Sequence, residues 1–61
     1  MLEFSKKILS KVSFDKYLFQ KELQKSIQWM NKKDVIHLKI WALITFSQYK
    51  NTILEVFDNL S

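Results

Sequence analysis

The sequence predicts a single all-α domain over residues 1–61, a compact bundle of three to four short helices with a central, mostly buried third helix. The chain contains neither Gly nor Pro. Gly is the usual residue of tight hairpin turns, and Gly and Pro are the two least favourable residues inside helices. Their absence therefore favours helices over a β-structure. Apolar residues recur at helical spacing through four segments. With 61 residues, the chain can form only one domain, and its core must be small.

The first helix is expected over residues 2–12. Phe4, Ile8 and Val12 follow one another at intervals of four and form the predicted inward face, with Leu9 beside them. Lysines occupy the other side. Ser13 or Asp15 can then cap the start of the next helix, because both have short side chains with an oxygen acceptor.

The second helix is expected over residues 16–30, with an apolar stripe on one side and Gln and Lys residues on the other. The stripe consists of Phe19, Leu23, Ile27 and Met30. Asn31 follows, with Asp34 three positions later. An Asn cap with an acid at this spacing resembles a capping box and predicts the start of a new helix.

The third helix, expected over residues 32–46, has no broad polar face. One of its sides carries Ile36, Ile40, Leu43 and Ile44, and a second side carries Val35, Leu38, Ala42 and Phe46. A helix that is apolar on nearly all sides is usually buried. Two arrangements remain open: the other helices cover this helix completely, or another chain covers one of its sides.

The fourth helix is expected over residues 48–60, with a break at Ser47. Without Gly or Pro this break is weak, and a helix running on from the third remains an alternative. A helix that folds back would cover the third one, which favours the break. The residues expected in the core are Phe4, Ile8, Phe19, Leu23, Ile27, Ile36, Ile40, Leu43, Ile44, Ile53, Val56 and Phe57.

Catalysis, metal binding and cofactor binding are not expected. The chain has no Cys and a single His, His37, which lies three residues after Asp34. The six acidic residues are scattered and match no metal-ligand spacing. A domain of this size also has little room for a small-molecule pocket. The apolar run over residues 35–46 is too short to span a bilayer, and no secretory signal is visible, so we expect a cytoplasmic protein.

The apolar content points to protein interaction as the first functional interpretation. The chain is 48% hydrophobic and 15% aromatic, slightly more than four short helices need to cover one another. Exposed aromatic clusters mark interfaces, and a symmetric homodimer is the simplest form of such an interaction. The candidate interface residues, which lie off the main stripes, are Leu18, Trp29, Trp41 and Leu54.

RNA binding, alone or within a ribonucleoprotein, is the alternative interpretation. The net charge is +4, and all ten basic residues are Lys. Lys can neutralise phosphates but lacks the bidentate guanidinium of Arg. Gln can reach base edges and an aromatic ring can stack on a base. The candidate nucleic-acid face consists of Lys6, Lys7, Lys11, Tyr17, Lys21, Gln24, Lys25, Gln28, Lys32 and Lys33.

Short segments of the chain resemble those of small uncharacterised helical proteins of Bacteroidota. The similarity lies in Lys-Val-Ser-Phe-Asp at residues 11–15, Leu18-Phe19, Lys-Glu-Leu at residues 21–23, and Leu-Lys-Ile-Trp at residues 38–41. The resemblance implies a bacterial cytosolic protein and carries no activity, cofactor or site with it. An AT-rich genome would also account for Lys in place of Arg.

Overall fold

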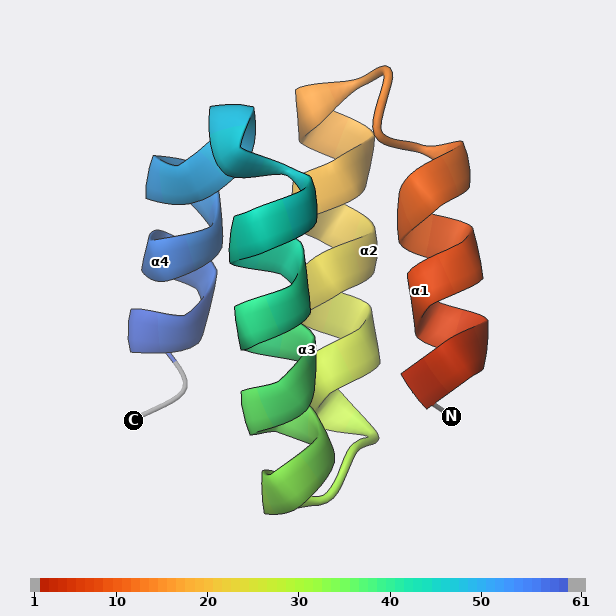
Figure 1. The fold of residues 1–61 in the computed structure, drawn as a ribbon, viewed down its shortest axis with the longest axis vertical. Coiled ribbons are helices and arrows are strands. Elements are labelled where there is room, and N and C mark those ends of the chain that lie inside the picture. The colour runs from red at the N-terminus through yellow and green to blue at the C-terminus, as the bar shows by residue number, and fades with distance from the viewer. Residues whose placement is uncertain (1, 60–61) are drawn as a thin grey trace.

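The protein folds into an up-down-up-down bundle of helices, seen in a computed structural model that describes residues 2–59 (Figure 1). The elements are α1 (Leu2–Lys11), α2 (Lys16–Gln28), α3 (Lys32–Thr45), the single 3₁₀ turn η1 (Ser47–Tyr49) and α4 (Lys50–Asp58). None of residues 2–59 forms a strand. The predicted all-α bundle is therefore confirmed, and the predicted Leu60 at the end of the fourth helix lies outside the described residues.

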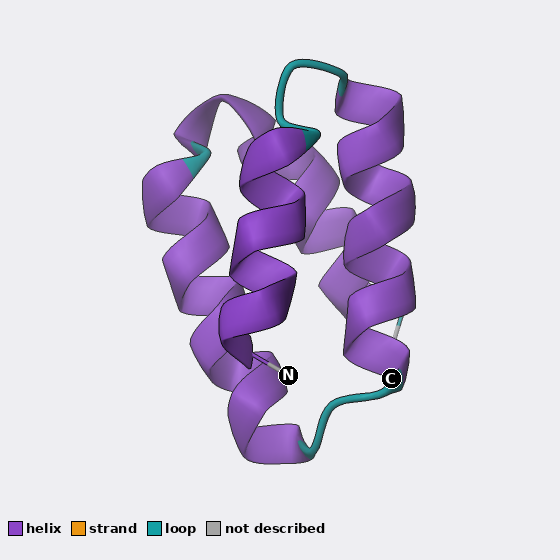
Figure 2. Cartoon of the chain, turned by 90° about the vertical axis from the view of Figure 1, so that its right-hand side faces the viewer, coloured by secondary structure: helices purple, strands orange, loops and turns teal. Residues whose placement is uncertain are grey.

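The helices occupy the four corners of the bundle. Helix α1 packs against α2 and α3, and α4 packs against the same two helices from the other side. Short loops connect successive helices (Figure 2). The bundle measures 27 × 22 × 19 Å, so each helix has one side toward the core and one toward solvent.

Side-chain caps fix the two helix starts that the sequence indicates. One carboxylate oxygen of Asp15 accepts hydrogen bonds from the backbone N–H groups of Tyr17 (2.9 Å) and Leu18 (3.3 Å). Asn31 Oδ1 accepts one from the N–H of Asp34 at 2.8 Å. Both caps satisfy donors that have no partner within the helix. The predicted cap at Asn31 is confirmed, and at the α2 start Asp15 rather than Ser13 is the capping residue.

Helices α3 and α4 are separate, and the break needs neither Gly nor Pro. Phe46 leaves the helical conformation at φ −120° and ψ 55°, and η1 follows at once. The Phe46 ring is buried and lies 5.0 Å from the Phe19 ring, centroid to centroid. The Tyr49 hydroxyl donates a hydrogen bond to the carbonyl oxygen of Ser13 at 2.6 Å. Core packing and this long-range bond therefore hold the turn in place.

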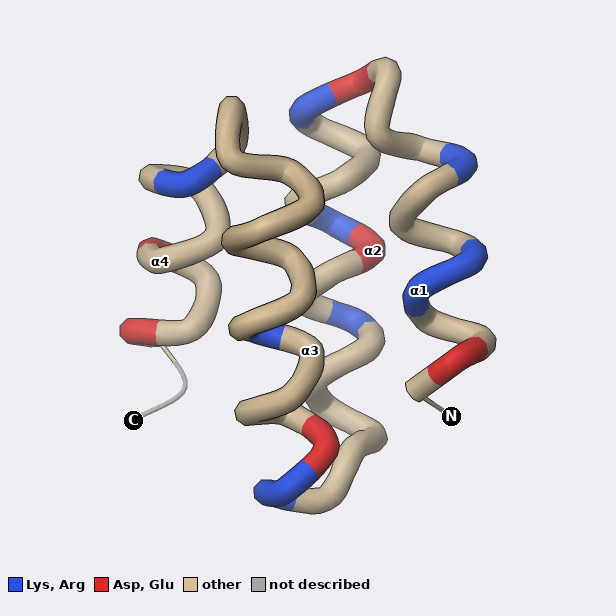
Figure 3. The backbone as a smooth tube through the Cα atoms, in the orientation of Figure 1, with Lys and Arg blue, Asp and Glu red and all other residues tan. Residues whose placement is uncertain are grey.

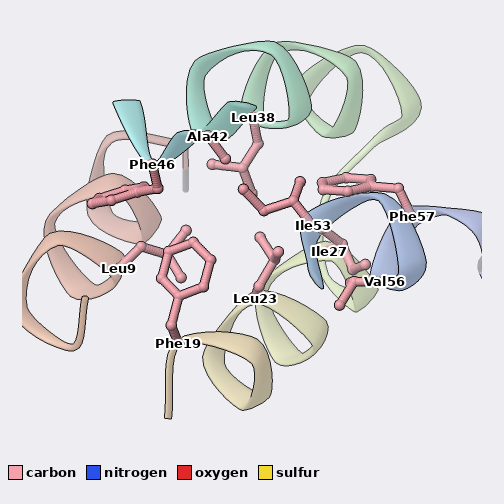
Figure 4. Packing of buried hydrophobic residues seen from close by; sticks show 10 residues of the cluster. All are labelled: Leu9, Phe19, Leu23, Ile27, Leu38, Ala42, Phe46, Ile53, Val56 and Phe57. Carbon is pink, nitrogen blue, oxygen red and sulfur yellow. The ribbon is translucent and has the colours of Figure 1, made fainter. Parts of the chain in front are cut away.

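One hydrophobic core lies between the four helices (Figure 4). Its members from α2 and α4 are all among the residues that the sequence predicts in the core. The buried residues are Leu9, Phe19, Leu23, Ile27, Leu38, Ala42, Phe46, Ile53, Val56 and Phe57.

The predicted inward face of α1 is correct at Val12, which packs against the core, and wrong at Phe4. Phe4 is 63% exposed and Ile8 is half-buried, whereas Leu9 is fully buried and Ser5 is buried beside it in the same row. A small Ser lets a helix approach its neighbours closely. Because Ser is polar, the row of Ser5 and Leu9 does not stand out as an apolar stripe in the sequence.

The prediction that α3 is buried on nearly all sides is also wrong. Only Leu38 and Ala42 of this helix are buried. Ile36, Ile40 and Ile44, predicted in the core, are 51%, 53% and 75% exposed, and Leu43 is half-buried. The side of α3 that faces the core carries Leu38 and Ala42, and the buried Phe46 after its end packs against Phe19.

Candidate interaction surface

Helix α3 presents a row of exposed aliphatic side chains to solvent, here called the isoleucine face. It consists of Ile36, Ile40 and Ile44, which are 51%, 53% and 75% exposed. Residues four apart lie one above another on a helix, so the three side chains form one continuous ridge. A run of large aliphatic residues with this regularity is unusual on a solvated helix, whose outer face is normally polar.

The sequence of α3 explains why this ridge exists. The helix is fixed at its start by the Asn31 cap and at its end by the buried Phe46 ring. With Leu38 and Ala42 in the core, a spacing of 100° per residue turns Ile36, Ile40 and Ile44 away from it. Nothing in the described part of the chain covers them to less than half exposure.

The borders of the isoleucine face differ in burial and include two Lys residues. Leu43 and Lys39 border it on one edge, and both are half-buried. Exposed Lys33 and His37 lie at its amino-terminal end and on its other edge. No acidic residue of α3 lies on this face, since Asp34 is on the side of the helix toward Trp41. The surface therefore combines an apolar ridge with Lys33 at its amino-terminal end and Lys39 along one edge.

The four candidate interface residues do not form one patch. Leu18 (38% exposed) and Trp29 (75% exposed) lie on the outer side of α2 and at its carboxyl end, roughly 16 Å apart along the helix. Leu54 is half-buried on α4. Trp41 is half-buried, with its ring edge-on to that of Phe46 at 5.4 Å. Leu18, Trp41 and Leu54 lie on three different helices, and Trp29 follows the end of α2.

The Trp41 side chain packs within the fold and is not free to contact a partner. The Lys6 Nζ atom lies 5.5 Å from the centroid of the Trp41 ring, which joins α1 to α3 through a cation–π contact. Lys6 also lies 3.5 Å from a carboxylate oxygen of Glu3. This arrangement closes the seam between α1 and α3.

The candidate nucleic-acid residues are brought together only in part. Tyr17, Lys21, Gln24, Lys25 and Gln28 are all exposed and share the outer side of α2. Tyr17, Gln20, Lys21 and Gln24 line a shallow, open depression of about 310 Å³.

The remaining lysines lie elsewhere on the molecule. Lys7 and Lys11 are exposed on α1, and Lys32 and Lys33 are exposed at the start of α3, whereas Lys6 is half-buried against Trp41. Figure 3 shows that Lys positions occur on all four helices instead of gathering in one stripe.

Neither a metal centre nor a membrane span emerges from the described residues. Within residues 2–59, no three His, Cys, Asp or Glu side chains come together as a cation site would require. In the same range, no helix combines the length and the apolar character needed to cross a bilayer.

Comparison with known proteins identifies no relative of this chain. No protein-family model, curated protein or solved structure matches this chain.

Proposed function

We propose that this chain is a small, non-catalytic interaction module that binds another protein, or itself, through the isoleucine face of α3. The observation that carries the proposal is the regular exposure of Ile36, Ile40 and Ile44 on a helix whose opposite side packs in the core. Contiguous exposed apolar side chains on a small domain mark interaction sites. A bacterial, cytoplasmic setting belongs to the same proposal.

The isoleucine face replaces the surface around Trp29 and Trp41 as the leading site. Trp41 is engaged by Phe46 and Lys6 within the fold, so its ring is not free to fill a partner's pocket. Trp29 is exposed but follows the last turn of α2. Binding energy in helix-in-groove complexes comes from anchors at regular spacing on one helix face, and α3 has them.

A comparison of two substitutions tests the proposal. The wild-type chain, the Ile40→Lys variant and the Trp29→Lys variant are immobilised and exposed to lysate, with the retained proteins identified by mass spectrometry. Both substitutions add one Lys at an exposed position, so they match in charge. We expect wild type and Trp29→Lys to retain the same partner, the chain itself included, and Ile40→Lys to lose it. Equal retention by all three would rule out the isoleucine face.

RNA binding is the second candidate, supported by the depression on α2. Tyr17 could stack on a base there while Lys21 contacts phosphate and Gln24 contacts a base edge. The Lys21→Ala/Lys25→Ala double variant is then expected to bind RNA more weakly and to reduce the salt slope by about two, one for each lost phosphate contact. RNA binding that does not respond to salt in fluorescence anisotropy would exclude this candidate.

A further inference from the structure

The α1–α2 turn carries the most exposed large apolar side chain of residues 2–59. Phe14 in this turn is 79% exposed, and Tyr17 in the first turn of α2 is 77% exposed. The turn lies at one end of the bundle, with the starts of α2 and α4 and the ends of α1 and α3 (Figure 1). We infer that this end, here called the turn end (residues 11–18 and the start of α4 at Lys50), binds the surface of an anionic lipid bilayer, with Phe14 inserted among the lipid headgroups. The inference does not depend on the isoleucine face.

The backbone on both sides of Phe14 is held by hydrogen bonds. The N–H group of Asp15 donates to the carbonyl oxygen of Val12 at 3.1 Å. The carbonyl oxygen of Ser13 accepts from the Tyr49 hydroxyl at 2.6 Å, which ties the turn to η1. The Phe14 ring is therefore presented to solvent from a fixed turn, so its insertion into a bilayer requires little ordering of the backbone.

Charge distinguishes the turn end from the opposite end of the bundle, which also presents an exposed aromatic ring, that of Trp29. The comparison covers the four terminal residues of each helix and the residues that connect the helices. In residues 2–59, the turn end then has three Lys and one acid, which are Lys11, Lys16, Lys50 and Asp15. The opposite end has three Lys and four acids, which are Lys25, Lys32, Lys33, Glu3, Asp34, Glu55 and Asp58. An anionic surface therefore attracts the turn end and repels the other.

The three Lys side chains of the turn end are all exposed and surround the turn on its helix ends. The single acid, Asp15, accepts hydrogen bonds from two backbone N–H groups at the start of α2. Each Lys close to an anionic bilayer strengthens binding about fivefold. The lysines thus supply the attraction to the lipid phosphates, and Phe14 supplies the apolar contact.

The size of the turn end favours a bilayer over a protein partner. A stable protein interface buries about 800 Å² on each partner, whereas the bundle measures 22 × 19 Å across its helices and only part of this end is apolar. A bilayer surface needs no complementary shape, and one inserted ring with basic neighbours is enough for weak binding. The Tyr17 ring has an apolar body and a polar tip, which suits the level of the headgroups.

Binding of this kind needs no helix that crosses the bilayer, because only one ring and the Lys head groups enter the interface. No membrane partner is expected from the sequence. The turn end combines one turn with separate helix ends, so it has no periodic pattern that could indicate it.

Vesicle flotation provides the first test. The wild-type chain is mixed with vesicles of phosphatidylcholine alone, or of phosphatidylcholine and phosphatidylglycerol in equal parts. We expect it to float with the anionic vesicles only, and added salt to weaken this binding because it screens the Lys charges. A wild type that does not bind the anionic vesicles, or that binds both kinds equally, overturns the inference.

Two exposed aromatic residues at opposite ends provide a matched pair of variants. Phe14→Ser is expected to weaken binding to the anionic vesicles roughly tenfold or more, because the ring no longer leaves water. Trp29→Ser, which is 75% exposed at the opposite end, is expected to bind as wild type does. Circular dichroism monitors the folding of both. Equal losses in the two variants would overturn the assignment to the turn end.

Two pairs of lysines test the electrostatic part in the same way. Lys11→Ala/Lys16→Ala is expected to weaken vesicle binding about 25-fold, from about fivefold for each Lys. Lys32→Ala/Lys33→Ala removes the same charge at the opposite end and is expected to have a much smaller effect. If both double variants lose binding equally, net charge rather than the turn end attracts the bilayer, and the inference fails.

Fluorescence quenching reports which end enters the bilayer. The Phe14→Trp/Trp29→Phe variant has one indole at the turn, while Trp41 stays packed within the fold. Vesicles with brominated acyl chains are expected to quench this variant strongly and the Trp29→Phe variant hardly at all. Equal quenching of the two would show that the turn end does not insert.

The outcomes also separate the turn end from the other surfaces of the molecule. Ile40→Lys is expected to bind anionic vesicles at least as tightly as wild type. If it loses them instead, the isoleucine face is the membrane contact and the turn end is excluded. If Phe14→Ser weakens binding to RNA while wild type ignores vesicles, the turn end binds nucleic acid and the bilayer is excluded. Neither result affects the proposed function, which the retention of proteins from lysate tests.

Discussion

The two Trp residues have different environments, and we therefore expect them to contribute differently to stability. Trp41 is half-buried, packs edge-on to Phe46 at 5.4 Å and lies beneath the Lys6 ammonium group, whereas Trp29 is 75% exposed. We expect Trp41→Ala to lower the free energy of unfolding by about 2 kcal/mol, less than for a fully buried ring. Trp29→Ala, its matched control, is expected to stay within about 0.5 kcal/mol of wild type. Urea denaturation followed by circular dichroism measures both, and equal losses would contradict the assigned environments.

The contribution of a single hydrogen bond to stability can be measured at Tyr49. Its hydroxyl donates to the Ser13 carbonyl at 2.6 Å, and its ring packs against Phe19 at 5.0 Å. Tyr49→Phe removes the first contact and keeps the second, so we expect a loss of about 1 kcal/mol in unfolding free energy. Tyr17→Phe removes a hydroxyl from an exposed ring and provides the control. A Tyr49→Phe variant as stable as Tyr17→Phe would show that this bond does not hold η1 to the α1–α2 turn.

At the scale of the helix, the start of α3 depends on one side chain. Asn31 Oδ1 accepts from the Asp34 N–H at 2.8 Å, and Asn31→Ala leaves that donor without its cap. We expect a loss of about 1 kcal/mol in thermal or chemical unfolding. Asn51→Ala changes the same residue type at an exposed position inside α4, where Ala favours the helix. It should therefore be neutral or stabilising, and a loss equal to that of Asn31→Ala would argue against capping.

Helices α2 and α4 could be predicted from the sequence in both position and orientation. Each has a single apolar stripe, so only one side of each can face a core. The cap at Asn31 was also predictable, because a short acceptor side chain directly before an apolar, helix-spaced segment is a typical helix start. At the start of α2 the sequence left Ser13 and Asp15 as alternatives, and the structure shows Asp15 as the cap. The break after Phe46 was harder to predict, since it depends on the burial of that ring beside Phe19 rather than on a local helix-breaking residue.

The orientations of α1 and α3 could not be predicted, for two different reasons. In α1 the inward row includes the polar Ser5, so the pattern favours the neighbouring row with Phe4 and Ile8. In α3 both sides are apolar, and periodicity cannot choose between them. Which side is buried depends on how the other helices pack against α3, and this packing buries Leu38 and Ala42. This wrong orientation also affected the candidate site. The prediction assigned Ile36, Ile40 and Ile44 to the core, although it left open that another chain covers one side of α3.

At the scale of the whole molecule, net charge opposes self-association while the isoleucine face favours it. Each chain carries +4, and two chains therefore repel one another at a distance. Salt screens this repulsion within a Debye length of about 10 Å at 0.1 M ionic strength. Added salt is thus expected to strengthen dimerisation, in contrast to nucleic-acid binding, which salt weakens. The same titration separates the two functional candidates.

The small core makes the stability of the chain sensitive to its own concentration. A domain of 61 residues is marginally stable alone, and any partner that binds only the folded state raises the unfolding temperature by mass action. We expect the unfolding temperature of wild type to rise with protein concentration and with salt in differential scanning calorimetry. That of Ile40→Lys is expected to stay constant with concentration, because a Lys within the isoleucine face opposes self-association while the core around Leu38 and Ala42 is kept. A wild-type unfolding temperature that does not depend on concentration would show that the isoleucine face contributes nothing to stability through a second copy.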